Sequence, residues 1–154
     1  MKIYLAHPIS TKGEFKDSIR VADEIRKLGY EVYAAAENKK INDKSNDPTP
    51  IDIYNGDVDE IIDSDIFVVN LTGGLQDGTI SEIGVVAGWN EGRTAFTGEK
   101  QIIAYTSNTR LLQPQHYNNI ASASANHLVL GMIDKWGEFV GSEQNMIKKL
   151  EDML

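Results

Sequence analysis

The feature that most constrains the fold is an alternation of short apolar runs with segments of helical periodicity. Residues 66–71 (Ile-Phe-Val-Val-Asn-Leu) form an almost uninterrupted apolar run, which is typical of a strand buried on both faces of a sheet. Similar runs occur at residues 2–6, 30–35 and 101–106, and residues 138–140 are a candidate fifth strand. Such strands favour a parallel sheet with both faces covered.

The segments between these runs have the apolar spacing of amphipathic helices. The clearest begins near Ser10, carries apolar residues three or four apart up to Leu28, and ends at Gly29. We expect further helices at residues 50–64, 79–91, 126–136 and 142–154. Alternating strands and helices predict a single-domain α/β sandwich over residues 1–154, flavodoxin-like or Rossmann-like, with a five-stranded, mostly parallel sheet and helices on both faces.

Composition excludes several classes of protein. The net charge of −8 and the scattered Lys and Arg residues argue against a nucleic-acid polymer as partner, so we expect a small-molecule ligand. No apolar run is long enough to span a membrane, and no signal-peptide pattern opens the chain, so we expect a cytoplasmic protein. The absence of cysteine rules out thiolate metal sites, and the three histidines are dispersed; we expect neither metal nor cofactor.

Two long polar tracts, residues 37–49 and 107–125, have the composition of loops. A structureless tract of this length inside a compact domain is often functional, so we expect the first to act as a lid.

Polar residues follow the predicted strand ends, where folds of this class bind their ligands. His7, Pro8 and Ser10 follow the first strand, and a glycine-containing turn at residues 72–78 follows the strand at 66–71. Neither phosphate-binding glycine motif is present, and two acids, Asp77 and Glu82, would repel a phosphate at that helix terminus.

Glu82 has two interpretations. The pattern Thr79-x-x-Glu82 matches a capping box, in which Glu82 would only satisfy the amide groups at its helix start. Alternatively, Glu82 lies beside a buried seam near the ligand crevice, where the helix N-terminus would keep its carboxylate ionised at neutral pH, as a nucleophile requires.

Asp57 and Tyr4 also have a structural and a functional interpretation. Asp57 belongs to an acidic helix, yet it shares a face with Ile53 and Ile61, and a carboxylate on an inner face needs a partner. Tyr4, inside the first strand, is by default a core aromatic residue whose hydroxyl is paired.

Three segments together resemble the nucleoside 2-deoxyribosyltransferase family in order and spacing. They are residues 2–8 (Lys-Ile-Tyr-Leu-Ala-His-Pro), residues 53–57 (Ile-Tyr-Asn-Gly-Asp) and residues 77–84 (Asp-Gly-Thr-Ile-Ser-Glu-Ile-Gly). The resemblance extends over nearly the whole chain.

This resemblance implies a role for each matching residue. Glu82 would attack C1′ of the sugar, Tyr4 would orient Glu82, and Asp57 and Asp77 would bind the nucleobase and help to protonate it. His7, Pro8 and Gly78 would line the substrate site. The family also borrows an Asn from a neighbouring subunit; Asn126 fits that place best and Asn119 is second. The implied protein is therefore a homodimer or larger homo-oligomer with shared active sites.

Three alternatives remain open. The first is an N-glycosidase of deoxynucleoside 5′-monophosphates, a related branch with Ser in place of Asp77; His7, Ser10, Lys12 and Arg110 could bind its phosphate. The second is a non-catalytic nucleoside- or nucleotide-binding domain. The third, a receiver-like domain, is disfavoured because Asn70 stands where such a domain needs Asp.

Overall fold

The computed structural model of the protein describes residues 1–72, 76–92, 97–109, 111–112, 115–117, 120–122 and 125–154. Its strands are β1 (Lys2–Ala6), β2 (Glu31–Ala34), β3 (Ile66–Asn70), β4 (Gln101–Tyr105), β5 (Gln115–Tyr117), β6 (Ile120–Ser122) and β7 (Gly137–Gly141). Its α-helices are α1 (Lys12–Lys27), α2 (Lys39–Asn42), α3 (Pro50–Asp63), α4 (Asp77–Gly92), α5 (His127–Trp136) and α6 (Glu143–Glu151).

Five strands form one parallel sheet in the order β2-β1-β3-β4-β7. The strand order reverses beside β1, because β2 lies on one side of it and β3 on the other. In open sheets of this kind, the crevice for ligands lies outside the carboxyl ends of the strands at such a reversal. The predicted five-stranded α/β sandwich is therefore confirmed, and its topology directs attention to the ends of β1 and β3.

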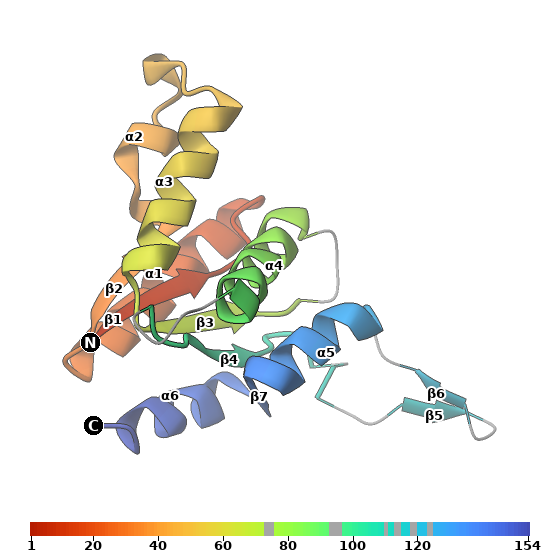
Figure 1. Cartoon of the computed structure of the whole chain (residues 1–154). Helices are drawn as coiled ribbons and strands as arrows, with labels where there is room; N and C mark the ends of the chain where they lie inside the picture. Colours follow the sequence, from red (N-terminus) through yellow and green to blue (C-terminus); the bar gives the residue numbers. More distant parts are fainter. Residues whose placement is uncertain (73–75, 93–96, 110, 113–114, 118–119, 123–124) are drawn as a thin grey trace.

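Helices cover both faces of the sheet (Figure 1). The core on one face joins the sheet to α1 and α6, through residues such as Ile25 and Leu150. The core on the other face joins the sheet to α3, α4 and α5, through residues such as Ile61, Ile83 and Ile133. Only the C-terminal part of α3 lies over the sheet; its N-terminal part extends beyond it, with α2 alongside (Figure 1).

Strand register places a row of side chains across the face that α3, α4 and α5 cover. Tyr4 in β1 pairs with Tyr33 in β2 on one side and with Phe67 in β3 on the other. The ring centroid of Tyr4 lies 5.2 Å from that of Tyr33 and 5.5 Å from that of Phe67. These spacings are typical of favourable aromatic pairs. The row fixes both tyrosine rings beneath α3 and α4.

Lys100 and Asn90 stabilise the end of the sheet at which β4 begins. The side-chain amide of Asn90 donates to the carbonyl of Lys100 and accepts from its N–H, both at 2.9 Å. The Lys100 ammonium donates to the carbonyls of Ile62 (2.7 Å) and Ser64. Ile62 and Ser64 lie at the end of α3, and Lys100 directly precedes β4. The contacts therefore connect the helix layer to the sheet at this end.

Three expectations about local structure were wrong or incomplete. Residues 37–49 are not a bare loop: a 3-10 turn at Ala35–Glu37 leads into them, and they contain α2, which Asn38 caps, and a second 3-10 turn at Lys44–Asn46. Part of residues 107–125 forms the β5–β6 hairpin, which projects from the domain (Figure 1). The first helix is capped by Thr11 rather than Ser10, since Thr11 completes a capping box with Glu14.

No helix within the described ranges is long and apolar enough to cross a membrane.

Two glycine substitutions test the packing of the edge strand. A Cβ added to Gly137 would lie 1.8 Å from the carbonyl oxygen of Ile102, whereas one added to Gly131 in α5 would meet nothing within 4 Å. We expect Gly137→Ala to lower the free energy of unfolding by on the order of 2–4 kcal/mol, because β7 must move away from β4. Gly131→Ala should raise it by about 0.5–1 kcal/mol, since alanine favours the helix. Urea denaturation measures both; equal effects would contradict this account.

Candidate active site

The centre of the candidate site is a hydrogen bond between Tyr4 and Glu82. The Tyr4 hydroxyl donates to Oε1 of Glu82 at 2.7 Å. Tyr4 is fully buried in β1, and Glu82 is partly buried in the second turn of α4. Burial, followed by the nearby charges of Glu82 and Asp57, raises the pKa of Tyr4 well above its ordinary value. The phenol therefore remains protonated and donates to the carboxylate.

This geometry excludes the capping-box interpretation of Glu82. The helix begins at Asp77, so Thr79 is already inside it, and the Glu82 side chain points to Tyr4 rather than to its own helix start. Of the two interpretations of Glu82, the structure supports an inward carboxylate at the edge of the core.

The protonation of Glu82 differs from our expectation. Burial raises the pKa of Glu82 to about 7; the Tyr4 hydrogen bond opposes the shift, and the charge of Asp57 adds to it. The sequence predicts that the helix N-terminus keeps this carboxylate ionised at neutral pH, but Glu82 lies beyond the first turn, where that effect has faded. Desolvation dominates, so the carboxyl titrates near neutral pH.

A second carboxylate–tyrosine pair lies beside the first. The Tyr33 hydroxyl donates to Oδ1 of Asp57 at 3.1 Å, and the Asn38 amide donates to the Tyr33 oxygen at 3.0 Å. Burial raises the pKa of Asp57, the Tyr33 hydrogen bond lowers it, and the charge of Glu60 raises it. Asp57 therefore faces inward, as its shared helix face with Ile53 and Ile61 suggested, rather than lying in a solvated acidic surface.

The two pairs form one electrostatic unit. Tyr4 and Tyr33 are strand partners whose rings lie in contact, tilted by 31°, and each donates to a carboxylate from the helices above. Since the charge of Asp57 raises the pKa of Glu82, ionising both carboxylates together is unfavourable.

Asp77 and Gly78 lie at the start of α4 and are exposed. The Asp77 carboxylate accepts a hydrogen bond from the N–H of Gly78 at 3.0 Å. Among the described residues, no hydrogen bond joins Asp77 to Glu82 or Asp57. The structure thus brings together Tyr4, Glu82 and Asp57, and places Asp77 and Gly78 at the start of α4, after residues 73–75, which lie outside the described ranges.

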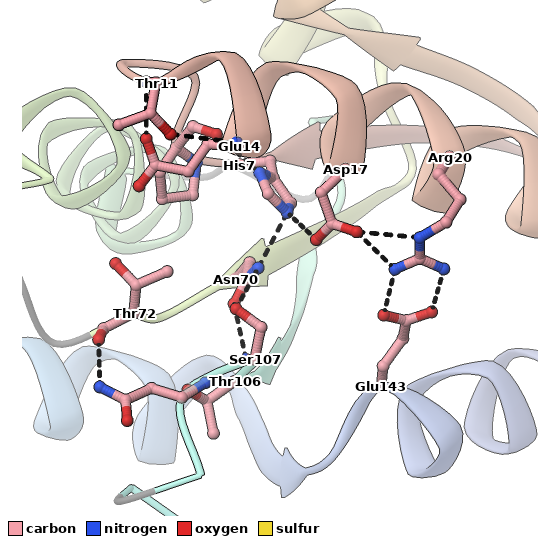
Figure 2. A network of polar contacts seen from close by, with 12 residues as sticks. His7, Thr11, Glu14, Asp17, Arg20, Asn70, Thr72, Thr106, Ser107 and Glu143 are labelled. Atoms are coloured by element: carbon pink, nitrogen blue, oxygen red, sulfur yellow. Dashed lines mark hydrogen bonds and ion pairs between the residues drawn. The ribbon is translucent and has the colours of Figure 1, made fainter.

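His7 belongs to a separate polar network on the other face of the sheet (Figure 2). The side-chain oxygen of Asn70 accepts from the N–H of Ser107, so its amide nitrogen faces Nε2 of His7, at 2.9 Å. Nε2 therefore accepts, and Nδ1 donates to the carbonyl of Pro8 at 2.7 Å. Both ring nitrogens have partners within the protein; substrate binding by His7 and by the buried Pro8 stays a prediction.

The same network reaches α1 and α6. The Asp17 carboxylate lies 3.3 Å from Nε2 of His7 and is held by Arg20, whose guanidinium also grips Glu143 through two hydrogen bonds of 2.7 Å (Figure 2). A bidentate pair of this kind fixes orientation. The ion pair therefore joins α1 to α6 beside the end of β1.

The remaining candidate residues are at the periphery. Asn126 is the exposed N-cap of α5, and its side-chain oxygen accepts from the N–H of Leu128 at 2.8 Å. Ser10 and Lys12 are exposed near the start of α1. The fallback Asn119 and the phosphate candidate Arg110 lie outside the described residues.

Sequence reasoning missed Tyr33 and Asn38. The register of β1 and β2 was the signal for Tyr33, because a tyrosine opposite Tyr4 on the neighbouring strand must share its face. Asn38 lies in the tract that we interpreted as a loop, so its capping role in α2 was not visible.

No group of three or more His, Cys, Asp or Glu side chains suited to a metal ion occurs in the described part of the chain.

Comparison with known proteins fits this geometry. A family model described as nucleoside 2-deoxyribosyltransferase matches residues 3–146. The chain belongs to this family. The match spans both carboxylate–tyrosine pairs, and it confirms the resemblance on which the assignment of Glu82, Tyr4 and Asp57 was based.

Solved structures share the fold of this deoxyribosyltransferase-family chain over nearly its whole length. A conserved protein from Enterococcus faecalis is 25% identical, with a TM-score of 0.77 and coverage of 100% of this chain and 99% of that chain. A CMP N-glycosidase from Clostridium botulinum is 18% identical, with a TM-score of 0.62 and full coverage of both chains. A 2-deoxyribosyltransferase from Bacillus psychrosaccharolyticus is 17% identical, with a TM-score of 0.63 and coverage of 97% and 96%. No curated protein matches the sequence.

The raised pKa of Glu82 predicts how the stability of the protein depends on pH. A carboxyl with a folded pKa of about 7 and an ordinary unfolded value of 4.5 favours folding below pH 4.5 and loses that contribution as pH rises through 7. Glu82→Gln should therefore raise the free energy of unfolding at pH 8 by up to about 3 kcal/mol and change it little at pH 4.5. Urea denaturation at both pH values measures this; an equal change at both would refute the burial of the charge.

Proposed function

We propose that the protein cleaves the N-glycosidic bond of 2′-deoxyribonucleosides and transfers the deoxyribosyl group to another nucleobase through a covalent intermediate on Glu82. The single observation that carries the proposal is the hydrogen bond from the buried Tyr4 hydroxyl to Oε1 of Glu82; within the described ranges no hydrogen bond engages Oε2, the oxygen proposed to attack. Family membership supplies the class of substrate.

In the first step, Oε2 of Glu82 forms a bond to C1′ as the bond from C1′ to the base nitrogen breaks. The electron pair of that bond goes to the base, which takes a proton from Asp57, with Asp77 at the mouth of the cleft helping to bind it. The sugar develops oxocarbenium character, and an opposed carboxylate captures it, as in retaining glycosidases. In the second step, another base attacks C1′, gives its proton to Asp57 and releases Glu82, with net retention.

The chemistry sets the protonation that the two carboxylates must have. The reactive state needs Glu82 ionised as nucleophile and Asp57 protonated as acid, which is one proton on two carboxylates. Because the charge of Asp57 raises the pKa of Glu82, protonating Asp57 favours the ionised form of Glu82. The proposed steps use only side chains of the protein, and the mechanism requires no cofactor.

We also propose that the working form is a homo-oligomer in the cytoplasm. Asn126, the residue proposed to reach a neighbouring active site, is exposed beside Leu128, whose side chain is 73% exposed. On α3, Ile51 and Tyr54 are exposed on the part of the helix that extends beyond the sheet. Exposed apolar residues on projecting elements are suited to contact with a second copy.

The decisive assay incubates the protein with deoxyadenosine and hypoxanthine, and in parallel with deoxynucleoside 5′-monophosphates. We expect free adenine and deoxyinosine in the first reaction, and Glu82→Gln should reduce the rate at least about a thousandfold because the nucleophile is lost. Circular dichroism checks that the variant is folded. Release of base only from monophosphates, with no new nucleoside, would instead support the N-glycosidase; retained turnover in Glu82→Gln would remove Glu82 from the mechanism.

The pH dependence of kcat/KM follows from the titration of Glu82. Because attack needs the anion, the rate should fall below a pH near 7, the pKa of Glu82. The Tyr4 hydrogen bond lowers the pKa of Glu82, so Tyr4→Phe should move this limb upward by about 0.5–1 pH unit. A rate that stays flat from pH 8 to pH 5 would contradict the assignment.

A further inference from the structure

The orientation of Asn38 is fixed by the helix that it caps. Its side-chain oxygen accepts a hydrogen bond from the N–H of Lys40 at 3.1 Å, as the N-cap of α2. With the oxygen used in this way, the amide nitrogen faces Tyr33, 3.0 Å from the hydroxyl oxygen. An amide nitrogen can only donate, so the Tyr33 oxygen is the acceptor of this hydrogen bond.

The direction of the next hydrogen bond follows. A tyrosine hydroxyl has one hydrogen, and because the Tyr33 oxygen accepts from Asn38, that hydrogen points to Oδ1 of Asp57 at 3.1 Å. Burial raises the pKa of Tyr33 above its ordinary value, so the hydrogen stays on the phenol at neutral pH. Oδ1 of Asp57 is thus an acceptor, and when Asp57 is protonated its hydrogen is on Oδ2.

We infer that Asn38 and Tyr33 are positioning residues that keep the transferable proton of Asp57 on Oδ2, the oxygen that does not contact Tyr33. This inference rests on the proposed function, in which Asp57 protonates the departing base. Without the two residues, the proton would divide between both oxygens, and the share on Oδ1 would point towards residue 33 of β2. Asn38, the N-cap of α2, therefore acts through Tyr33 to determine which oxygen of Asp57 carries the proton.

Besides burial, two neighbouring groups shift the pKa of Asp57: Tyr33 from β2 and Glu60 from α3. The charge of Asp57 in turn raises the pKa of Tyr4 in β1 and of Glu82 in α4. The Tyr33 hydrogen bond lowers the pKa of Asp57, and the charge of Glu60 raises it. Removing the Tyr33 donor must therefore raise the pKa of Asp57 further.

Two substitutions change the hydrogen bonds around Asp57 while keeping the fold. Tyr33→Phe removes the donor to Asp57. Asn38→Asp keeps an N-cap for α2, because aspartate caps helices as well as asparagine does, but it can only accept from Tyr33. The Tyr33 hydrogen then turns towards residue 38 and leaves Asp57. Tyr30→Phe is the matched control, since it removes a phenol that donates to the carbonyl of Leu150 at 2.9 Å on the other face of the sheet.

The kinetic readout is kcat for base release as a function of pH, in the full-length protein. Tyr33→Phe and Asn38→Asp should each lower kcat by about 10- to 100-fold with little change in KM, since a misdirected general acid loses part of its usual advantage. The limb on the alkaline side, where Asp57 loses its proton, should move to higher pH by at least about half a unit in both. Tyr30→Phe should lower thermal stability and leave this limb in place.

A second readout does not depend on turnover. The carboxyl carbon of Asp57, labelled with ¹³C and assigned with Asp57→Asn, should titrate at higher pH in both variants than in the parent protein. If the parent releases no base but this titration moves, the proposed function fails and the hydrogen-bond chain stands. If the titration is unchanged, the inference is overturned. If the titration moves while the kinetic profile of an active parent does not, Asn38 and Tyr33 have no part in catalysis and the inference is again overturned.

Discussion

The pairing of Tyr4 with Tyr33 across β1 and β2 is the contact on which the site depends. Parallel register sets the two rings side by side on one face, and the phenol oxygens reach the helices packed above them. Glu82 from α4 and Asp57 from α3 then find their donors without any loop having to order. A site built from regular elements holds its geometry more tightly than one built from loops. Sheet register therefore places the two phenols that hold the carboxylates of Glu82 and Asp57.

This placement has a thermodynamic consequence. A carboxylate beside a buried phenol and a second carboxylate is poorly solvated, and the raised pKa values of Glu82 and Asp57 express that penalty. A protein selected only for stability would have no reason to keep two acids there. The surrounding core compensates: every residue of β3 is buried, and Lys100 with Asn90 secures the end of the sheet at which β4 begins. These stabilising contacts thus offset the cost of burying the carboxylates of Glu82 and Asp57.

The sequence allowed most of the fold and half of the site to be predicted. The apolar runs located all five strands of the main sheet, since their pattern is a property of the chain alone. The β5–β6 hairpin and α2 were not predicted, because short polar elements show little apolar periodicity and depend on local caps. Resemblance to a family identified Tyr4, Glu82 and Asp57, but Tyr33 and Asn38 act only through strand register and a helix cap. The protonation of Glu82 could not be predicted, because it is set by burial, which spacing does not report.

Alternation along β1 separates two residues that stand three positions apart in one motif. Side chains of a strand point to opposite faces in turn, so Tyr4 and Ala6 join the core beneath α4, while Ile3 and Leu5 join the core beneath α1 and α6. His7 continues the second set, and its contacts to Asp17 and Asn70 lie on that side (Figure 2). Closeness in sequence therefore does not bring His7 into the chemistry of Tyr4. Within this motif, Tyr4 donates to Glu82, the proposed nucleophile, whereas His7 on the opposite face accepts from Asn70 of β3.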